Sequence, residues 1–227
     1  MPFLIILATL GFLALMFGPQ VWVRQTMRRH GEDRPDYPGT GAELARQLLD
    51  EAGLQHVSVE VTEEGDHYHP DEKAVRLSEE NYHGRSVTAV AVAAHEVSHA
   101  LQDRDHYAPL HIRQKLVVQA NMVQRIGIVL LTAAPLVFAV IKSPALLVVE
   151  VLAALAIMAT TVAVHAVTLP TEFDASFKRA LPALASYIPA EDMPAARQVL
   201  KAAAYTYVAA ALVSLLDLRL WLRIFGR

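Results

Sequence analysis

The chain has 227 residues, of which 54% are hydrophobic and 19% charged, and its formal net charge is −3. A soluble domain is usually less apolar and more charged, so this composition favours a membrane protein with a modest soluble part. The small net charge argues against a nucleic-acid-binding protein. The chain has no cysteine, which excludes a disulfide framework, a Cys-ligated metal and a thiol nucleophile.

The N-terminal segment predicts an uncleaved membrane anchor. Residues 2–23 are nearly uncharged, and about 20 such residues suffice to cross a bilayer core. A signal peptide would begin with positive charge, whereas here Arg24, Arg28 and Arg29 follow the apolar run. By the positive-inside rule, we expect the C-terminal end of this anchor to face the cytoplasm.

The next segment predicts a small α+β domain. Residues 30–41 contain several Pro and Gly and are typical of a linker, and Thr40 then begins a short amphipathic helix that Gly53 ends. The pattern that follows predicts a half-buried strand, a turn-rich connection and a second strand, at residues 57–61, 62–71 and 73–77. We expect Ser78 or Ser86 to cap a buried helix beyond them.

That buried helix carries the sequence His95-Glu96-Val97-Ser98-His99. On a helix, His95 and His99 leave the same face about one turn apart, so both can bind one Zn²⁺. Glu96 can act as the general base that takes a proton from the attacking water. A chance match on a surface helix is the alternative. Such a helix would have a polar face, whereas residues 87–94 are apolar on nearly every side.

Three more apolar runs predict membrane spans, so that the chain has about four. They lie at residues 126–141, 145–167 and 199–216, with a tight turn around Lys142 between the first two. Most Lys and Arg residues lie in the segments between the spans, which we therefore expect on the cytoplasmic side. The predicted organisation is an anchor, a catalytic domain, a transmembrane hairpin, a ligand-carrying segment and a C-terminal span, at residues 1–23, 24–125, 126–167, 168–198 and 199–227.

A catalytic zinc needs a third protein ligand, and Glu172 is the first candidate. It begins a predicted helix just after the third span, with Ser176 and Arg179 near its side of the helix, where they could orient its carboxylate. Asp174 is the chief competitor and His165 a distant third. On an α-helix Asp174 points about 200° away from Glu172, so we expect it in a surface ion pair with Lys178. A solvated carboxylate near the helix N-terminus is the alternative for Glu172.

Several separated motifs, in order along nearly the whole chain, resemble the YugP-like membrane zinc metallopeptidases. They lie at residues 40–43, 66–68, 75–78, 81–86, 93–100, 107–110, 169–176 and 203–210. The resemblance implies an integral-membrane neutral zinc peptidase of the gluzincin type, distantly related to the HtpX and CAAX-prenyl proteases. Glu172 matches the glutamate of their second ligand motif. Ser176 stands where those relatives carry Asp, and Ser98 stands where the family pattern usually has Gly.

The fold expected is therefore mainly α, with about four membrane spans and a small zincin-like α+β domain built around the helix of His95. We expect a zinc metalloendopeptidase in which His95, His99 and Glu172 hold Zn²⁺ and Glu96 is the base. The partners expected are a peptide or protein substrate, either soluble or membrane-associated, and the lipid bilayer, with no nucleic acid. The alternative is a catalytically silent zinc-binding membrane scaffold or chaperone partner.

Some roles stay open in the sequence. The strand at 73–77 is a plausible edge for an extended peptide substrate. A donor to the oxyanion could be any of seven side chains: His67, Tyr68, His106, His165, Tyr187, Tyr205 and Tyr207. His67 and His69 are a weak candidate for a second metal site. Glu150, and Asp217 with Arg219, are expected at interfacial or water-facing positions.

Overall fold

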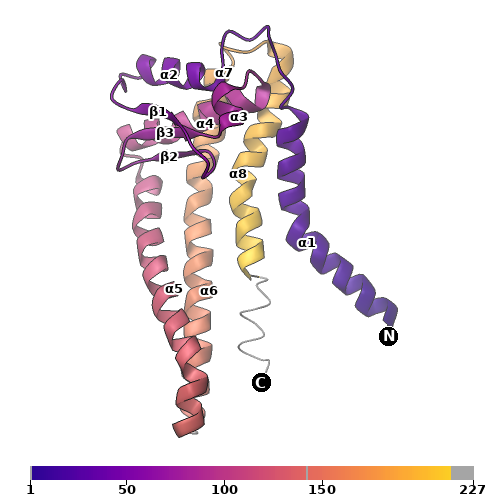
Figure 1. Ribbon diagram of the computed structural model, residues 1–227, viewed down its shortest axis with the longest axis vertical. Helices are drawn as coiled ribbons and strands as arrows, with labels where there is room; N and C mark the ends of the chain where they lie inside the picture. Colours follow the sequence, from indigo (N-terminus) through magenta and orange to yellow (C-terminus); the bar gives the residue numbers. More distant parts are fainter. Residues whose placement is uncertain (1, 142, 216–227) are drawn as a thin grey trace.

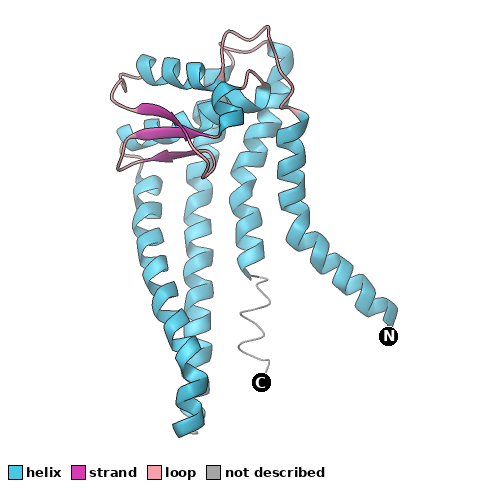
Figure 2. Ribbon diagram, in the orientation of Figure 1, coloured by secondary structure: helices cyan, strands magenta, loops and turns pink. Residues whose placement is uncertain are grey.

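A computed structural model describes residues 2–141 and 143–215, and it shows a small α+β cap above a set of long helices (Figures 1 and 2). Four helices make up the long part: α1 (Pro2–Arg29), α5 (Ala108–Ile141), α6 (Pro144–Phe173) and α8 (Met193–Leu215). α5 packs on α6, α6 on α8 and α8 on α1, so the four helices form an arc in that order. Asp217 and Arg219 lie outside the described residues.

Two helical segments among the described residues are long and apolar enough to cross a membrane. They are Ala108–Ala133, within α5, and Val148–Leu184, which covers most of α6, the π-helix at Asp174–Ala180 and the short helix α7 (Leu181–Leu184). Large apolar side chains such as Val129 and Leu152 are exposed along them, as lipid-facing residues would be. These two segments overlap the predicted hairpin. The spans expected at 2–23 and 199–216 are helical in α1 and, as far as Leu215, in α8, but the four-span arrangement stays a prediction.

Two of the long helices extend further along the chain than the sequence analysis predicts. α5 runs unbroken from Ala108 to Ile141, joining the amphipathic stretch to the apolar run, and α6 continues past residue 167 to Phe173. Glu150 on α6 is 7% exposed. Its expected water-facing position is therefore wrong, whereas the alternative, an interfacial position, stays a prediction.

The first helix of the cap, α2 (Gly41–Glu51), begins and ends as the sequence predicts. The Thr40 hydroxyl accepts a hydrogen bond from the Glu43 amide at 3.3 Å, and the Thr40 amide donates to the Glu43 carboxylate at 2.7 Å. This reciprocal pair is a capping box. Gly53 follows the helix with a φ of 73°, a conformation that favours glycine. The helix therefore presents Leu44 and Leu49 to the cap's core.

The cap's sheet has three strands in the order β1-β3-β2: β1 (Ser58–Val61), β2 (His67–His69) and β3 (Ala74–Leu77). β3 pairs parallel with β1 and antiparallel with β2.

Two expectations about the strands are wrong. The stretch expected to be only turns contains β2, since three residues are too few to show an alternating pattern. The strand at 73–77 is central, so both of its edges are already paired and it cannot take a peptide.

The helix with the two histidines, α4 (Val87–Arg104), lies in the middle of the cap, and nearly all of its residues are buried. Ser86 caps it by accepting a hydrogen bond from the Ala89 amide at 3.1 Å. Ser78 instead precedes an unpredicted short helix, α3 (Glu79–His83). The Thr88 hydroxyl donates to the Met27 carbonyl at 2.8 Å. α4 therefore begins where α1 ends.

The junction between α4 and α5 depends on one residue in a left-handed conformation. His106 has a φ of 51°, the His106 amide donates to the Asp103 carbonyl, and the Tyr107 amide donates to the Gln102 carbonyl. These are the two hydrogen bonds of a Schellman motif, in which the residue at His106 is usually glycine.

We predict that His106→Gly raises the free energy of unfolding by about 0.5–1 kcal/mol, because glycine removes the left-handed strain at a smaller entropic cost. Thermal unfolding in detergent measures the change. The control, Gln119→Gly in the exposed interior of α5, should lower stability by about 1 kcal/mol. Destabilisation by both variants would contradict the assigned turn.

Candidate metal centre

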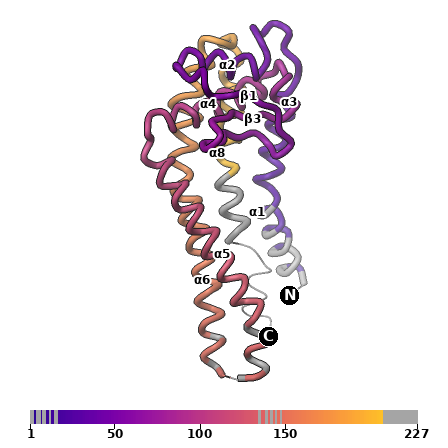
Figure 3. Tube along the Cα trace, turned by 60° about the vertical axis from the view of Figure 1, so that its left-hand side comes forward, coloured from indigo at the N-terminus to yellow at the C-terminus, as the bar shows by residue number. Residues whose placement is uncertain are grey.

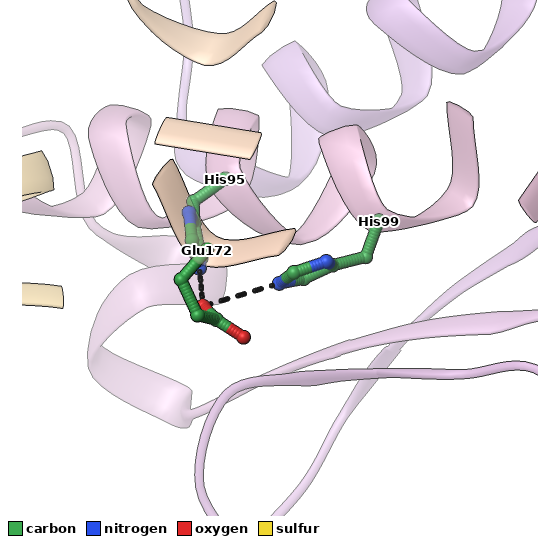
Figure 4. Close-up of side chains that lie close together, drawn as sticks. All are labelled: His95, His99 and Glu172. Atoms are coloured by element: carbon green, nitrogen blue, oxygen red, sulfur yellow. Dashed lines mark ion pairs between the residues drawn. The ribbon is translucent and has the colours of Figure 1, made fainter. Parts of the chain in front are cut away.

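Three side chains meet between α4 and the end of α6: His95, His99 and Glu172 (Figure 4). The Oε2 atom of Glu172 lies 3.2 Å from His95 Nε2 and 3.6 Å from His99 Nε2. The exposed fractions of these residues are 5%, 7% and 0%. The two imidazole rings approach edge to face, with their centroids 4.8 Å apart. The sequence prediction that these three residues lie together is therefore met in the structure.

The cluster fits a zinc ion in both geometry and chemistry. Tetrahedral zinc with bonds of about 2.0–2.1 Å holds its ligand atoms about 3.3 Å apart, close to the separations seen here. The Oε2 atom of Glu172 is buried and has no hydrogen-bond partner. A buried carboxylate oxygen is costly to leave without a donor or a cation, so a metal ion at this point would satisfy it.

A polar side chain contacts the Nδ1 atom of each histidine, the ring nitrogen that does not face Glu172. His95 Nδ1 lies 3.1 Å from the Ser176 hydroxyl, and His99 Nδ1 lies 2.9 Å from the Gln102 side-chain oxygen. With these partners, both Nε2 atoms face Glu172. Hydrogen bonds of this kind fix the ring orientation of a metal-binding histidine. Ser176 therefore serves His95, and not Glu172 as expected from the sequence.

The Gln102 side chain, fully buried, joins His99 to the start of the π-helix at Asp174–Ala180. Its amide donates to the Thr171 carbonyl and to the Asp174 carboxylate, both at 2.9 Å. Asp174 in turn accepts from Arg179 Nε at 2.9 Å. Asp174 thus supports the second histidine through Gln102, so it belongs to the surroundings of the site and not to its ligand set.

The expected ion pair of Asp174 with Lys178 is present at 3.8 Å, but its expected surface position is wrong, since Asp174 is only 7% exposed and is covered by Gln102 and Arg179. The expected position of Arg179 beside Glu172 is also wrong, because Arg179 bonds Asp174 and Asp105. For Arg179 the reason is the π-helix, whose i to i+5 hydrogen bonds shift the angular position of each later residue relative to an α-helix. An α-helical register applied to residues 172–180 therefore misplaces the side chains that follow Glu172.

Arg113 on α5 is the residue of the site that sequence reasoning missed. Its Nη1 atom donates to Glu172 Oε1 at 2.9 Å, which leaves Oε2 facing the histidines. The available signal was weak, because Arg113 lies with Lys115 in the amphipathic start of α5, before the apolar run in which a charged residue would indicate function.

The site's electrostatics follow from burial and from the closeness of opposite charges. Burial raises the pKa of the Glu96 carboxyl, although His95 and His99 oppose the shift. For His99, burial lowers the pKa, but the Glu172 carboxylate outweighs it and the net pKa is raised. Glu96 is 8% exposed.

A cavity of about 790 Å³ opens on the site and contains Glu96 on its wall. Among the seven candidates for an oxyanion donor, only His67 and Tyr68 line this cavity, and the Tyr207 side chain is not described. Burial and the Asp103 carboxylate raise the pKa of Tyr68, and its hydroxyl donates to Asp103 at 2.7 Å. His67 is therefore the better placed of the two.

The other predicted metal-binding candidates are not part of the cluster. Within residues 2–141 and 143–215, only His95, His99 and Glu172 form a group able to hold a metal. His165 lies two helical turns before Glu172, and His69 contacts Glu72 at 3.7 Å. The pairing of His67 with His69 thus gains no support as a second metal site.

A buried pair of histidines with a carboxylate, beside a second carboxylate in a cavity, defines a candidate metal-dependent hydrolytic centre. The chain matches, over residues 4–226, the family described as "Putative neutral zinc metallopeptidase". The match covers nearly the whole chain, and the protein belongs to this family.

One relative extends the comparison to a particular protein. The chain is 39% identical over 228 residues to a protein of Bacillus subtilis (strain 168) named "Putative membrane protease YugP", covering 98% of this chain and 96% of that protein. That name and the two membrane-length helices both fit an association with the membrane. No solved structure matches the chain.

We predict that Glu172→Ala abolishes tight zinc binding, whereas Gln102→Leu weakens zinc affinity by about 10–100-fold, because His99 loses its orienting partner. Asp174→Asn should have a similar but smaller effect, since it acts through Gln102. Competition with a chromogenic chelator measures these affinities. Gln119→Leu on the exposed face of α5 is the matched control and should bind zinc normally. Equal loss in Glu172→Ala and Asp174→Asn would contradict the separation of ligand from support.

Proposed function

We propose that the protein is a membrane-bound zinc endopeptidase in which His95, His99 and Glu172 hold the metal and Glu96 is the general base. The observation that carries this proposal is the convergence of three buried ligand atoms within 4.8 Å of one another, next to a carboxylate that lines the same cavity. Membership of a zinc metallopeptidase family supports the choice of metal and of reaction.

Different residues have different roles in the proposed hydrolysis. A zinc ion held at this cluster would supply a Lewis acid that polarises the peptide carbonyl and activates water. Glu96 accepts the proton of the attacking water and delivers it to the leaving amine, so that the nitrogen departs neutral. Arg113 keeps Glu172 Oε1 occupied, so Glu172 offers one oxygen to the metal.

The peptide substrate is proposed to lie along β2. This strand is an edge of the sheet, because β3 pairs with it on one side and the sheet ends there. Residues of β2 and its flanking turns line the cavity, among them Asp66, His67 and Pro70. An extended peptide can bond to an edge strand through backbone groups. This position replaces the central strand β3 that the sequence suggested.

His67 is proposed as the side chain that stabilises the developing oxyanion. Its Nδ1–H donates to the Gly65 carbonyl at 2.8 Å, which fixes the ring. The imidazolium form of His67 then offers its second N–H, at Nε2, to an oxyanion in the cavity. A catalytically silent zinc scaffold is the alternative function. The position of Glu96 on the cavity wall favours an enzyme, since a scaffold has no need of a buried base at this point.

The test compares Glu96→Gln with the wild type. We predict that the variant retains about one zinc per chain but loses about 10²–10⁴-fold in turnover of an unfolded protein substrate, since proton transfer is lost while the ligands remain. Metal analysis and initial rates measure the two effects. His95→Ala should lose the zinc, and Glu51→Gln, on the exposed face of α2, should change neither. Near-normal proteolysis by Glu96→Gln would favour another mechanism.

The catalytic cap is proposed to face the cytoplasm, with the turn between α5 and α6 on the other side of the membrane. Single cysteines can test this arrangement, because the chain has none of its own. We predict that Gln55→Cys and Lys178→Cys react with an impermeant maleimide from the cytoplasmic side only, and Ser143→Cys from the opposite side only. Labelling of Ser143→Cys from the cytoplasmic side would show that the hairpin does not cross.

A further inference from the structure

The cavity at the metal centre extends well beyond the reacting groups and changes in polarity along its length. The end formed by β2 and its turns is polar and includes Asp66, His67 and Asp71. The other end is formed by side chains of three long helices: the apolar Met27 of α1, Leu110, Val117 and Val118 of α5 and Ala203 of α8, together with the polar Gln114 and Lys115 of α5 and Thr206 of α8. A ligand that fills the whole cavity therefore meets mainly polar side chains at one end and several large apolar side chains at the other.

The apolar end lies at the level of the membrane surface if the α5–α6 hairpin crosses the bilayer. Val118 stands 23 residues before the end of α5, about 35 Å along the helix, against a hydrocarbon core of about 30 Å. Glu172 stands 28 residues beyond the start of α6, about 42 Å along it. The metal centre therefore lies several ångströms further from the bilayer than Val118.

The sequence of α1 independently indicates that this end of the cavity lies at the membrane surface. Met27 lines the cavity and is the residue directly before Arg28 and Arg29, with Arg24 one turn earlier. Basic residues that follow an apolar run are found at the headgroups of the lipids. The end of the cavity at Met27 is therefore at headgroup height.

Part of the cavity wall is exposed at this height. α1 and α5 are the two ends of the helical arc (Figures 1 and 3), and side chains of both line the cavity. Val118 is 70% exposed although it lines the cavity. Six residues of α5 line the cavity, and all but Lys115 follow helical spacing on one face: Leu110, Arg113, Gln114, Val117 and Val118. This face leads from the apolar end up to the ligand Glu172, which Arg113 contacts.

We propose that the substrate is the juxtamembrane segment of a membrane-anchored polypeptide, which enters from the side with an apolar residue against Val117 and Val118 and is cut just outside the bilayer. Such a segment has the required polarity, because it is apolar where it leaves the membrane and polar beyond. The rise from Val118 to the metal centre allows only a few extended residues between the anchor and the cut bond. This inference rests on the proposed peptidase function and adds the class of substrate.

The experiment uses the full-length zinc-loaded protein in vesicles and three substrates with one shared reporter segment. The first joins the reporter directly to a membrane anchor, the second inserts a Gly/Ser spacer of about 40 residues, with a mean span of about 35 Å, and the third has no anchor. Anchors are placed N-terminal in one set and C-terminal in another. We expect the direct fusion to be cut at least about tenfold faster than the other two in one of these orientations.

A matched pair of variants tests the apolar end. Val118→Ser should slow cutting of the direct fusion by about tenfold relative to its cutting of a soluble unfolded protein. Val129→Ser, at an equally exposed valine of α5 that does not line the cavity, should have no effect. Binding is read without chemistry in the Glu96→Gln background, where Val118→Cys should form a disulfide with a cysteine placed beside the anchor of the direct fusion.

The outcomes separate this inference from the proposed function. Equal cutting of all three substrates, or cutting of the soluble unfolded protein alone, overturns the juxtamembrane assignment and leaves the peptidase standing. Failure of Val118→Cys to cross-link any of the three shows that a lipid chain or nothing occupies the apolar end, which also overturns it. Failure to cut the fusions and the soluble unfolded protein alike overturns the peptidase function itself.

Discussion

The carboxylate of Glu172, fully buried against two imidazole rings, is the interaction on which the site depends. Removing a carboxylate from water costs several kcal/mol unless charges and hydrogen-bond donors compensate it. Here Arg113 satisfies one oxygen, and His95 and His99 face the other. Because these groups come from α4, α5 and α6, the carboxylate fixes the relative positions of the cap and the hairpin. A polar centre of this kind specifies one packing among many that apolar surfaces would allow.

The residues that orient the histidines are joined to one another by hydrogen bonds. Behind His99, a continuous series of hydrogen bonds leads through Gln102, Asp174 and Arg179 to Asp105, at the end of α4. Asp174 keeps the α-helical geometry of α6, with its amide donating to the Pro170 carbonyl, and the π-helix that begins there determines where Arg179 lies. π-helical turns are uncommon and occur often at functional sites, where they reposition a side chain that a regular helix would direct elsewhere.

The sequence predicted those parts of the site whose residues lie close together in the chain, and it missed those that depend on contacts between distant segments. His95, Glu96 and His99 lie in one helix, so their spacing and apolar surroundings sufficed. The capping box at Thr40 and the hairpin around residue 142 are equally local. Arg113, Gln102 and the inward position of Asp174 depend on contacts between segments distant in the chain. β2 was missed because three residues carry too little pattern, and that omission led to the wrong choice of edge strand.

The order of the ligands along the chain has a consequence for biosynthesis. His95 and His99 precede the hairpin and Glu172 lies near the end of its second helix, so most of the hairpin's 34- and 30-residue helices separates the two parts of the proposed metal centre. A ribosome-bound chain that has released α4 holds only two of the three proposed ligands. If the hairpin crosses the bilayer as proposed, Glu172 reaches the two histidines only after α6 has returned through it. Assembly of the membrane part would then set the moment at which the protein can first bind its metal tightly.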